Sequence, residues 1–174
     1  DEVGRGPLAG PVSVCLVSCD LVVYESLKKL KQLPPKGIYS KKLRPEEREK
    51  YAGILKLLSQ EGKISYSISH ISNKIIDSRG LSFAIKQAVF LGIRKLNKKI
   101  RLNPKNCQIR LDGGLRAPKE NKKQKTIIKG DEKEKIIAWA SILAKVSRDA
   151  LMYKMAKKFP KYGFETHKGY GTLG

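Results

Sequence analysis

Apolar and hydroxyl side chains alternate without interruption from residue 64 to residue 69 of the chain. Ile64, Tyr66 and Ile68 fall on one side of an extended backbone, and Ser65, Ser67 and Ser69 fall on the other. A period of two residues is typical of a β-strand that lies in a sheet with one face covered. The segment therefore predicts a strand with one dry face, and the fold must provide a layer to cover it.

Other segments predict the layers around this strand. A second alternating run at residues 11–17 predicts another strand, and residues 107–112 and 126–131 predict two short ones. Apolar residues recur at helical spacing in residues 45–58, 81–96 and 134–159, the last of which we expect to end near Pro160. This order predicts an α/β fold in which antiparallel pairing comes first and a mixed sheet is flanked by helices.

The charge balance indicates a polyanionic partner. The chain has 37 Lys and Arg against 16 Asp and Glu, a formal net charge of +21. Such an excess favours nucleic acid, although a lysine-rich proteome would also produce basic proteins, and charge does not distinguish binding from cleavage. No run approaches the roughly 18 apolar residues of a membrane span. Three cysteines without a C-x-x-C pair favour buried thiols in a reducing cytoplasm, and we expect no membrane association.

Acidic residues stand at strand ends or glycine turns in this basic chain. Asp1 and Glu2 precede Gly4, Asp112 precedes Gly113-Gly114, and Asp131 follows Gly130. Gathering carboxylates is unfavourable without a cation, because each raises the pKa of its neighbours, and oxygen ligands suit Mg²⁺ or Mn²⁺. Two such ions about 3.5–4 Å apart can stabilise the attacking and leaving oxygens of a phosphodiester. The alternative is that each acid separately caps a helix or forms a surface ion pair.

Other chemistries have less support in the sequence. His70 continues the alternating strand, where a structural role is expected, and a histidine acid–base ribonuclease has only His167 besides. No phosphate-binding G-x-x-x-x-G-K-[ST] loop and no G-x-G-x-x-G pattern is present. Nucleotide hydrolysis and dinucleotide redox chemistry therefore lack a sequence basis.

An ordered series of motifs resembles ribonuclease HII. "DEVGRGPLAGPV" at residues 1–12 is similar to that family's signature, with Val3 where Ala is usual, and six further motifs follow in the family's order: "SKKL" (40–43), "IIDSRGL" (75–81), "LDGG" (111–114), "IIKGD" (127–131), "ASILAKVSRD" (140–149) and "YGFETHKGYGT" (162–172). The resemblance covers almost the whole chain. It implies the ribonuclease H-like mixed sheet with flanking helices, as a catalytic core over residues 1–149. It also implies the start of a C-terminal helical segment, with residues 150–174 packed as part of the same domain.

The resemblance also implies an activity. That activity is endonucleolytic cleavage of RNA in RNA–DNA hybrids and cleavage on the 5′ side of ribonucleotides embedded in duplex DNA. The products would carry a 3′-hydroxyl and a 5′-phosphate. It implies roles in ribonucleotide removal and RNA primer removal, and a monomeric enzyme.

The resemblance further implies residue roles. Asp1, Glu2, Asp112 and Asp131 match the four metal-binding carboxylates, expected to hold two Mg²⁺ or Mn²⁺ ions when substrate is bound. Asp149 also stands in a motif, but a structural ion pair is expected there. The glycine turn, residues Gly4, Arg5 and Gly6, would read the ribose 2′-hydroxyl and its phosphate through the backbone. Tyr170 would pack on the sugar at the RNA–DNA junction, and Lys41 and Lys168 would contact phosphates.

Some residues depart from the family's pattern. Tyr39 stands where Asp usually precedes "SKKL", so either that loop is expected to be shifted or its hydrogen bonds are expected to be replaced. Trp139 stands where Ala is usual and must fill a pocket or displace a neighbour. The chain also opens on Asp1 without an initiator Met, so a preceding segment is expected.

Two other functions remain open from the sequence. A non-catalytic RNA-binding protein explains the charge but not four acids beside glycine turns. Another metal-dependent nuclease or strand-transfer enzyme on the same sheet would share the acids but needs neither the glycine turn nor Tyr170.

Overall fold

Two short sheets form the centre of the fold. A computed structural model describes residues 1–103 and 105–171, so Thr172 of the last motif and residues 172–174 of the predicted C-terminal segment lie outside the described residues. Strands β1 (Glu2–Val3), β2 (Val12–Ser18) and β3 (Ser65–Ile71) pair antiparallel in the order β1-β2-β3. Strands β4 (Ile109–Asp112) and β5 (Gln124–Ile127) pair in parallel. The antiparallel pairing predicted for the first strands is confirmed, and the parallel pairing lies in a second sheet of two strands.

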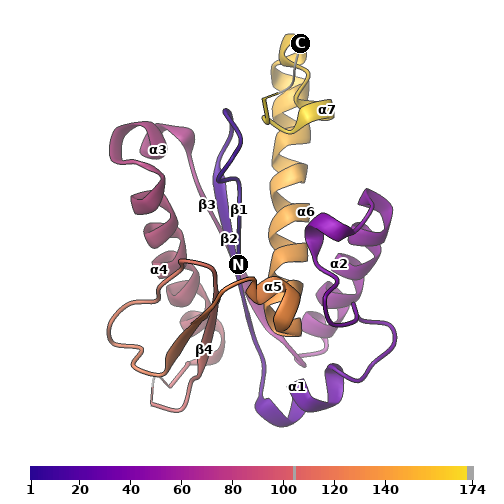
Figure 1. Ribbon diagram of the computed structural model, residues 1–174, viewed down its shortest axis with the longest axis vertical. Coiled ribbons are helices and arrows are strands. Elements are labelled where there is room, and N and C mark those ends of the chain that lie inside the picture. The colour runs from indigo at the N-terminus through magenta and orange to yellow at the C-terminus, as the bar shows by residue number, and fades with distance from the viewer. Residues whose placement is uncertain (104, 172–174) are drawn as a thin grey trace.

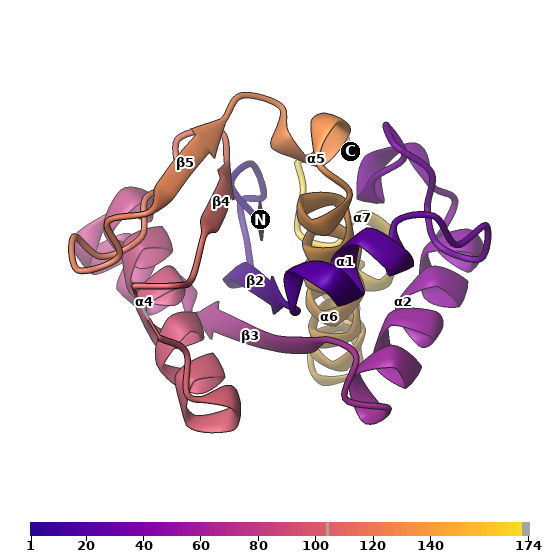
Figure 2. The same ribbon diagram turned by 90° about the horizontal axis from the view of Figure 1, so that it is seen from below.

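Helices cover both faces of the three-stranded sheet. Their bounds are α1 (Leu21–Leu27), α2 (Pro45–Gln60), α3 (Asn73–Arg79), α4 (Leu81–Ile100), α5 (Gly130–Lys133), α6 (Lys135–Lys158) and α7 (Phe164–His167). Helices α3 and α4 lie on one side of the strands and α6 lies on the other, with α2 outside α6 (Figure 1). Figure 2 shows the same layers end on, with β4 and β5 beside the N-terminal end of the chain.

Strand β2 separates two apolar clusters. Val12 and Val14 are fully buried and pack with Ala88 and other residues of α4. Cys15 faces the opposite way, into the cluster built by α2 and α6. Since successive side chains of a strand point to opposite faces, one strand supplies both halves of the core.

The prediction of a single dry face on β3 is wrong. Ser67 and Ser69, on the side expected to face water, are buried at 4% and 1% exposure. The Ser67 hydroxyl donates a hydrogen bond to the Gly92 carbonyl of α4 at 2.8 Å, so the hydroxyl is satisfied inside the protein. A Cβ at Gly92 would lie 2.8 Å from Leu16 Cδ1, which shows how closely α4 approaches the sheet.

Among the described residues, helix α6 carries more buried side chains than any other helix. It ends at Lys158, just before Pro160, as predicted. Trp139 is completely buried in the core, and its ring packs edge-to-face against Tyr24 at 5.7 Å between centroids. Within the described residues, no helix combines the length and apolar character needed to cross a membrane.

Candidate metal centre

Three carboxylates converge where β1 meets the end of β4. One carboxylate oxygen from each of Asp1, Glu2 and Asp112 lies within 4.8 Å of the others. These three residues are called the carboxylate cluster below. The N-terminal end that carries two of them lies between β4 and α6 (Figure 2). The structure therefore brings together acids that are 110 residues apart in the sequence, as predicted from their positions at strand ends.

Backbone pairing fixes the first two acids. The Asp1 nitrogen donates to the Cys15 carbonyl at 3.0 Å, and the Cys15 N–H donates to the Asp1 carbonyl at 3.0 Å. The Glu2 N–H donates to Asp1 Oδ1 at 2.7 Å, which orients that carboxylate. Because β2 is the middle strand of its sheet and its first four residues are buried, these bonds tie the cluster to the core.

A glycine holds the third acid. Gly130 N–H donates to Asp112 Oδ1 at 2.5 Å, at the start of α5. A Cβ at Gly130 would lie 3.1 Å from that oxygen and 2.8 Å from Ile137 Cδ1. Glycine at this position lets the backbone approach the Asp112 carboxylate closely.

Glu2 has an unused ligand atom. Its Oε1 accepts from Arg5 Nε at 2.6 Å, while its Oε2 is buried and has no hydrogen-bond partner within the described residues. Burial raises the pKa of Glu2 and the charge of Asp112 raises it further, although Arg5 acts in the opposite direction. A divalent cation would stabilise a buried carboxylate oxygen without a partner on a residue that clusters with two other carboxylates, so the donor set fits a hard metal ion such as Mg²⁺ or Mn²⁺.

Asp131 lies beside the cluster but is not one of its three members. It stands in the first turn of α5, one residue after Gly130. Burial raises the pKa of Asp131, the charge of Asp112 raises it further, and Lys41 lowers it. The two acids are therefore neighbours, and the role of Asp131 as a fourth ligand stays a prediction.

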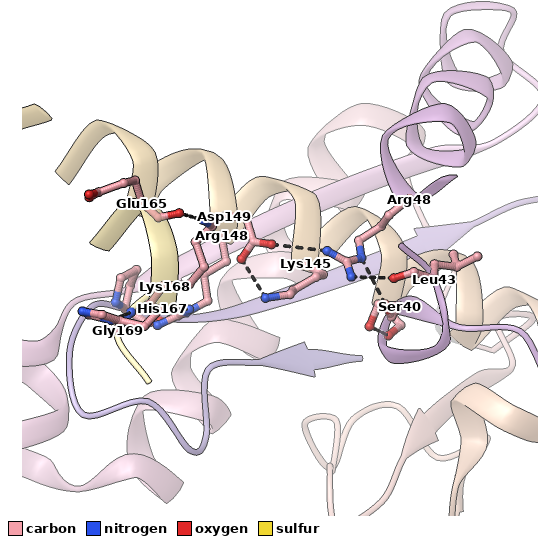
Figure 3. A network of polar contacts seen from close by, with 12 residues as sticks. Ser40, Leu43, Arg48, Lys145, Arg148, Asp149, Glu165, His167, Lys168 and Gly169 are labelled. Carbon is pink, nitrogen blue, oxygen red and sulfur yellow. Dashed lines mark hydrogen bonds and ion pairs between the residues drawn. The ribbon is translucent and has the colours of Figure 1, made fainter. Parts of the chain in front are cut away.

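The other motif acid, Asp149, lies in an ion-pair network on α6. It pairs with Lys145 Nζ at 2.8 Å and with Arg48 Nη1 at 3.4 Å (Figure 3). The structural ion pair expected for Asp149 is confirmed. His70 is held between Ser13 at 2.7 Å and Ser147 at 3.1 Å, which fits the structural role expected for it.

The glycine turn lies against Tyr170. Gly4 has a φ of +100°, a conformation that strongly favours glycine. A Cβ at Gly6 would lie 3.8 Å from the Tyr170 ring, which is 39% exposed. Leu8 N–H donates to the Gly169 carbonyl at 2.8 Å and so joins the two segments. The structure thus places the predicted ribose-reading residues side by side.

The two predicted phosphate contacts differ in their surroundings. Lys41 is exposed in a short 3-10 turn (Ser40–Lys42), close enough to Asp131 to influence its pKa. Lys168 instead lies over the Tyr153 ring at 3.9 Å and donates to the Glu165 carbonyl. The departure at Tyr39 is compensated, since its hydroxyl donates to Glu132 Oε1 at 3.3 Å.

Comparison with known proteins decides the family. The family model described as Ribonuclease HII matches residues 1–173. The chain belongs to the ribonuclease HII family.

Individual relatives agree with this assignment. Over 172 residues the chain is 42% identical to ribonuclease HII of Clostridium beijerinckii, covering 99% of this chain and 58% of the relative. Over 174 residues it is 40% identical to ribonuclease HII of Caldicellulosiruptor bescii, covering 99% and 74%. A crystal structure of ribonuclease H2 from Pyrococcus horikoshii OT3 is similar with a TM-score of 0.69 and 28% identity, over 99% of this chain and 79% of that one. The predicted ribonuclease H-like fold is confirmed.

Sequence reasoning missed two residues of this ribonuclease HII site. Gly130 stands within the "IIKGD" motif, but only the structure shows that it supports Asp112. Arg148 stands in "ASILAKVSRD", and only its complete burial singles it out from the other 36 basic residues. The sequence signal available for Arg148 was its position as a charged residue inside a long apolar helical pattern.

Proposed function

We propose that this chain is a metal-dependent endoribonuclease that cleaves RNA in RNA–DNA hybrids. It also cuts on the 5′ side of ribonucleotides embedded in duplex DNA, and leaves a 3′-hydroxyl and a 5′-phosphate. The observation that carries the proposal is the carboxylate cluster beside a glycine turn and an exposed tyrosine. Ribonucleotide removal and RNA primer removal are the roles that follow.

Each element of the site has a chemical task in this proposal. Asp1, Glu2, Asp112 and Asp131 would hold the ions, and backbone N–H groups orient the carboxylates of Asp1 and Asp112 for this. When bound, two Mg²⁺ or Mn²⁺ ions supply Lewis-acid stabilisation of the attacking and leaving oxygens of the phosphodiester. Burial raises the pKa of Glu2, and a bound cation would favour the charged form of this carboxylate.

Recognition of the substrate falls to a second group of residues. Backbone groups of Gly4, Arg5 and Gly6 approach the 2′-hydroxyl and its phosphate, because the glycines leave no Cβ in the way. The exposed face of Tyr170 packs on the sugar at the RNA–DNA junction. Lys41 contacts a phosphate near the metals, and Lys168 contacts one only after leaving the Tyr153 ring.

The proposal extends to the organisation of the molecule. The hydrogen bond between Leu8 and Gly169 supports a single domain, in which the described part of residues 150–174 packs with the core over 1–149. The protein acts as a monomer in the cytoplasm, on an RNA–DNA hybrid or on duplex DNA that contains ribonucleotides.

A cleavage assay tests the proposal. The protein is incubated with Mg²⁺ or Mn²⁺ and a DNA duplex that contains one ribonucleotide, with an all-DNA duplex in parallel. We expect one cut, 5′ of the ribonucleotide, and none in the all-DNA duplex. Cleavage of both would favour the alternative metal-dependent nuclease, and binding without any cut would favour a non-catalytic nucleic-acid-binding protein.

A matched pair of variants locates the activity. Asp112→Asn removes one ligand charge and is expected to lower cleavage by about a thousandfold or more while binding is kept. Asp20→Asn is the control, because Asp20 caps α1 through the Val22 N–H and Asn caps equally well. Equal activity of both variants would remove Asp112 from the site.

A further inference from the structure

Arg148 is a fully buried arginine that takes part in none of the ion pairs of the described residues. Its guanidinium instead donates three hydrogen bonds to backbone carbonyls. Nε donates to Pro11 O at 2.9 Å, Nη1 to Lys168 O at 3.0 Å and Nη2 to Ala9 O at 3.0 Å. A buried charge is costly unless it is hydrogen-bonded, so these three carbonyls determine where the side chain lies.

The three carbonyls belong to the two segments that carry the proposed ribose contacts. Ala9 and Pro11 follow the glycine turn, and Lys168 precedes Tyr170. Figure 3 shows the Arg148 side chain leaving α6 toward Lys168 and Gly169. Pro11 and Ala9 lie 137 and 139 positions before Arg148, and Lys168 lies 20 positions after it. One side chain therefore holds two segments that are far apart in the sequence.

The contact between residues 4–11 and 168–170, called the joint, has no room for an added methyl group. A Cβ at Gly4 would lie 2.8 Å from Arg148 Nε, and a Cβ at Gly169 would lie 2.4 Å from the Ala9 carbonyl oxygen. Leu8 N–H and Ala9 N–H both donate to the Gly169 carbonyl, at 2.8 and 3.2 Å. A displacement of Arg148 is therefore transmitted to both segments.

Arg148 also contacts the tyrosine itself. Its guanidinium carbon lies 5.8 Å from the centroid of the Tyr170 ring, and Lys145 Nζ lies 5.6 Å from the same centroid. Cations at this distance are attracted to an aromatic ring. Tyr170 remains 39% exposed although Arg148 and Lys145 both contact its ring.

We propose that Arg148 is the positioning residue for ribose recognition, which holds Tyr170 at a fixed place relative to the glycine turn. It acts by holding Tyr170 against the turn and does not touch the substrate. Only a planar fork with donors in three directions reaches all three carbonyls, so a lysine cannot replace it. The inference rests on the proposed function, since it assigns a task within that site.

A double-mutant cycle on Arg148 and Tyr170 tests the proposal. In the wild type, Arg148→Lys is expected to lower kcat on the single-ribonucleotide duplex by about tenfold and to change KM less than about threefold. In a Tyr170→Ala background the same substitution is expected to change kcat by less than about twofold, because the group that it positions is gone. Tyr170→Phe keeps the ring and its contacts with both cations, and is the matched control. Independent, multiplicative losses from the two substitutions would overturn the proposal.

Hydrogen exchange provides a readout that does not need catalysis. The Leu8 and Ala9 amides are expected to lose at least tenfold of their protection in Arg148→Lys, while Cys15, which pairs with Asp1, keeps its protection. If the wild type cuts no ribonucleotide, the proposed function fails, and exchange still decides whether Arg148 holds this joint. Unchanged protection of Leu8 and Ala9 would overturn the inference alone.

A second variant covers the case in which Arg148→Lys does not fold. Gly169→Ala keeps the Arg148 side chain but places a methyl group against the Ala9 carbonyl, which accepts from Arg148 Nη2, and so separates the two segments. We expect the same selective fall in kcat. Full activity of Gly169→Ala would show that the joint is not needed, and would overturn the proposal.

Discussion

At the scale of single residues, Gly130 controls how well the carboxylate cluster holds a metal. Gly130→Ala is expected to weaken Mn²⁺ binding by about tenfold, because the new methyl group meets Asp112 Oδ1 and Ile137. Isothermal titration calorimetry measures this directly. The control is Gly53→Ala in α2, where a Cβ meets nothing within 4 Å; it should leave metal binding unchanged and stabilise the fold by about 0.5–1 kcal/mol. Equal Mn²⁺ affinity of both variants would contradict the role given to Gly130.

The raised pKa values of Glu2 and Asp131 predict how metal binding depends on pH. Burial is the main cause for both residues, and the charge of Asp112 adds to it. A metal binds the deprotonated carboxylates, so Mn²⁺ affinity is expected to fall as the pH drops through these raised values. The fall is up to about tenfold per pH unit for each carboxyl that must lose its proton. A constant affinity down to the pH at which ordinary carboxylates titrate would contradict this.

The raised pKa of Glu2 also affects the stability of the metal-free protein. Lowering the pH weakens metal binding but favours this fold. The folded state binds the Glu2 proton more tightly than the unfolded state does, so the charged carboxylate destabilises the metal-free fold above the folded pKa. That disadvantage disappears as the pH falls below the unfolded pKa. In metal-free protein, Glu2→Gln is therefore expected to raise Tm at neutral pH, and the difference from wild type should shrink on acidification. A difference that grows on acidification would reverse the sign assigned here.

Sequence reasoning placed Asp1, Glu2 and Asp112 in one cluster because each lies at a strand end or beside a glycine turn. Arg148 could not be found in this way. Its partners are three backbone carbonyls, which carry no side-chain signature, and they lie on segments far from it in the sequence. A site is predictable where its chemistry is in the side chains and unpredictable where the backbone supplies it.

At the scale of elements, α6 anchors the 3-10 turn that carries Lys41. Arg48 of α2 donates to the Ser40 carbonyl at 3.0 Å and to the Leu43 carbonyl at 2.9 Å, and it pairs with Asp149 of α6. Figure 3 shows this connection between the turn and the helix. The side chains of Arg48 and Asp149 are only 12% and 11% exposed, so solvent screens the pair weakly.

Breaking this pair is expected to loosen the turn. Asp149→Asn keeps the shape but removes the charge, and should lower the free energy of unfolding by about 1–3 kcal/mol in urea titrations. The control is Glu61→Gln, whose pair with Lys63 is 53% exposed on both sides; it should change stability by less than about 0.5 kcal/mol. Equal effects of the two substitutions would mean that burial does not strengthen the Asp149 pair.

Elements with a strong hydrophobic period were the predictable ones. Helices α2, α4 and α6 and strands β2 and β3 were expected within a few residues of where they lie. Helix α1 was missed, since its seven residues are too few for a period to emerge, and its only signal is the N-cap at Asp20. The buried serine face of β3 could not be predicted, because the acceptor that satisfies Ser67 lies on α4.

At the scale of the whole molecule, a net charge of +21 surrounds a small acidic centre. Affinity for nucleic acid is therefore expected to come mainly from phosphate contacts, and the choice of cleavage site from the cluster and glycine turn. A protein that makes 6–10 phosphate contacts loses about 10³–10⁵ in affinity between 50 and 200 mM salt. We expect the affinity of this chain for an RNA–DNA hybrid to decrease by an amount in that range. Fluorescence anisotropy in the presence of Ca²⁺ measures this affinity.

The contribution of one lysine can be separated from the total charge. Lys41→Ala is expected to reduce the slope of log K against log salt by about one, because one phosphate contact is lost. Lys63→Ala removes the same formal charge, but its ammonium is already paired with Glu61 at 2.8 Å, so the slope should not change. If both variants lower the slope equally, affinity follows the net charge of the molecule, and Lys41 has no specific phosphate to bind.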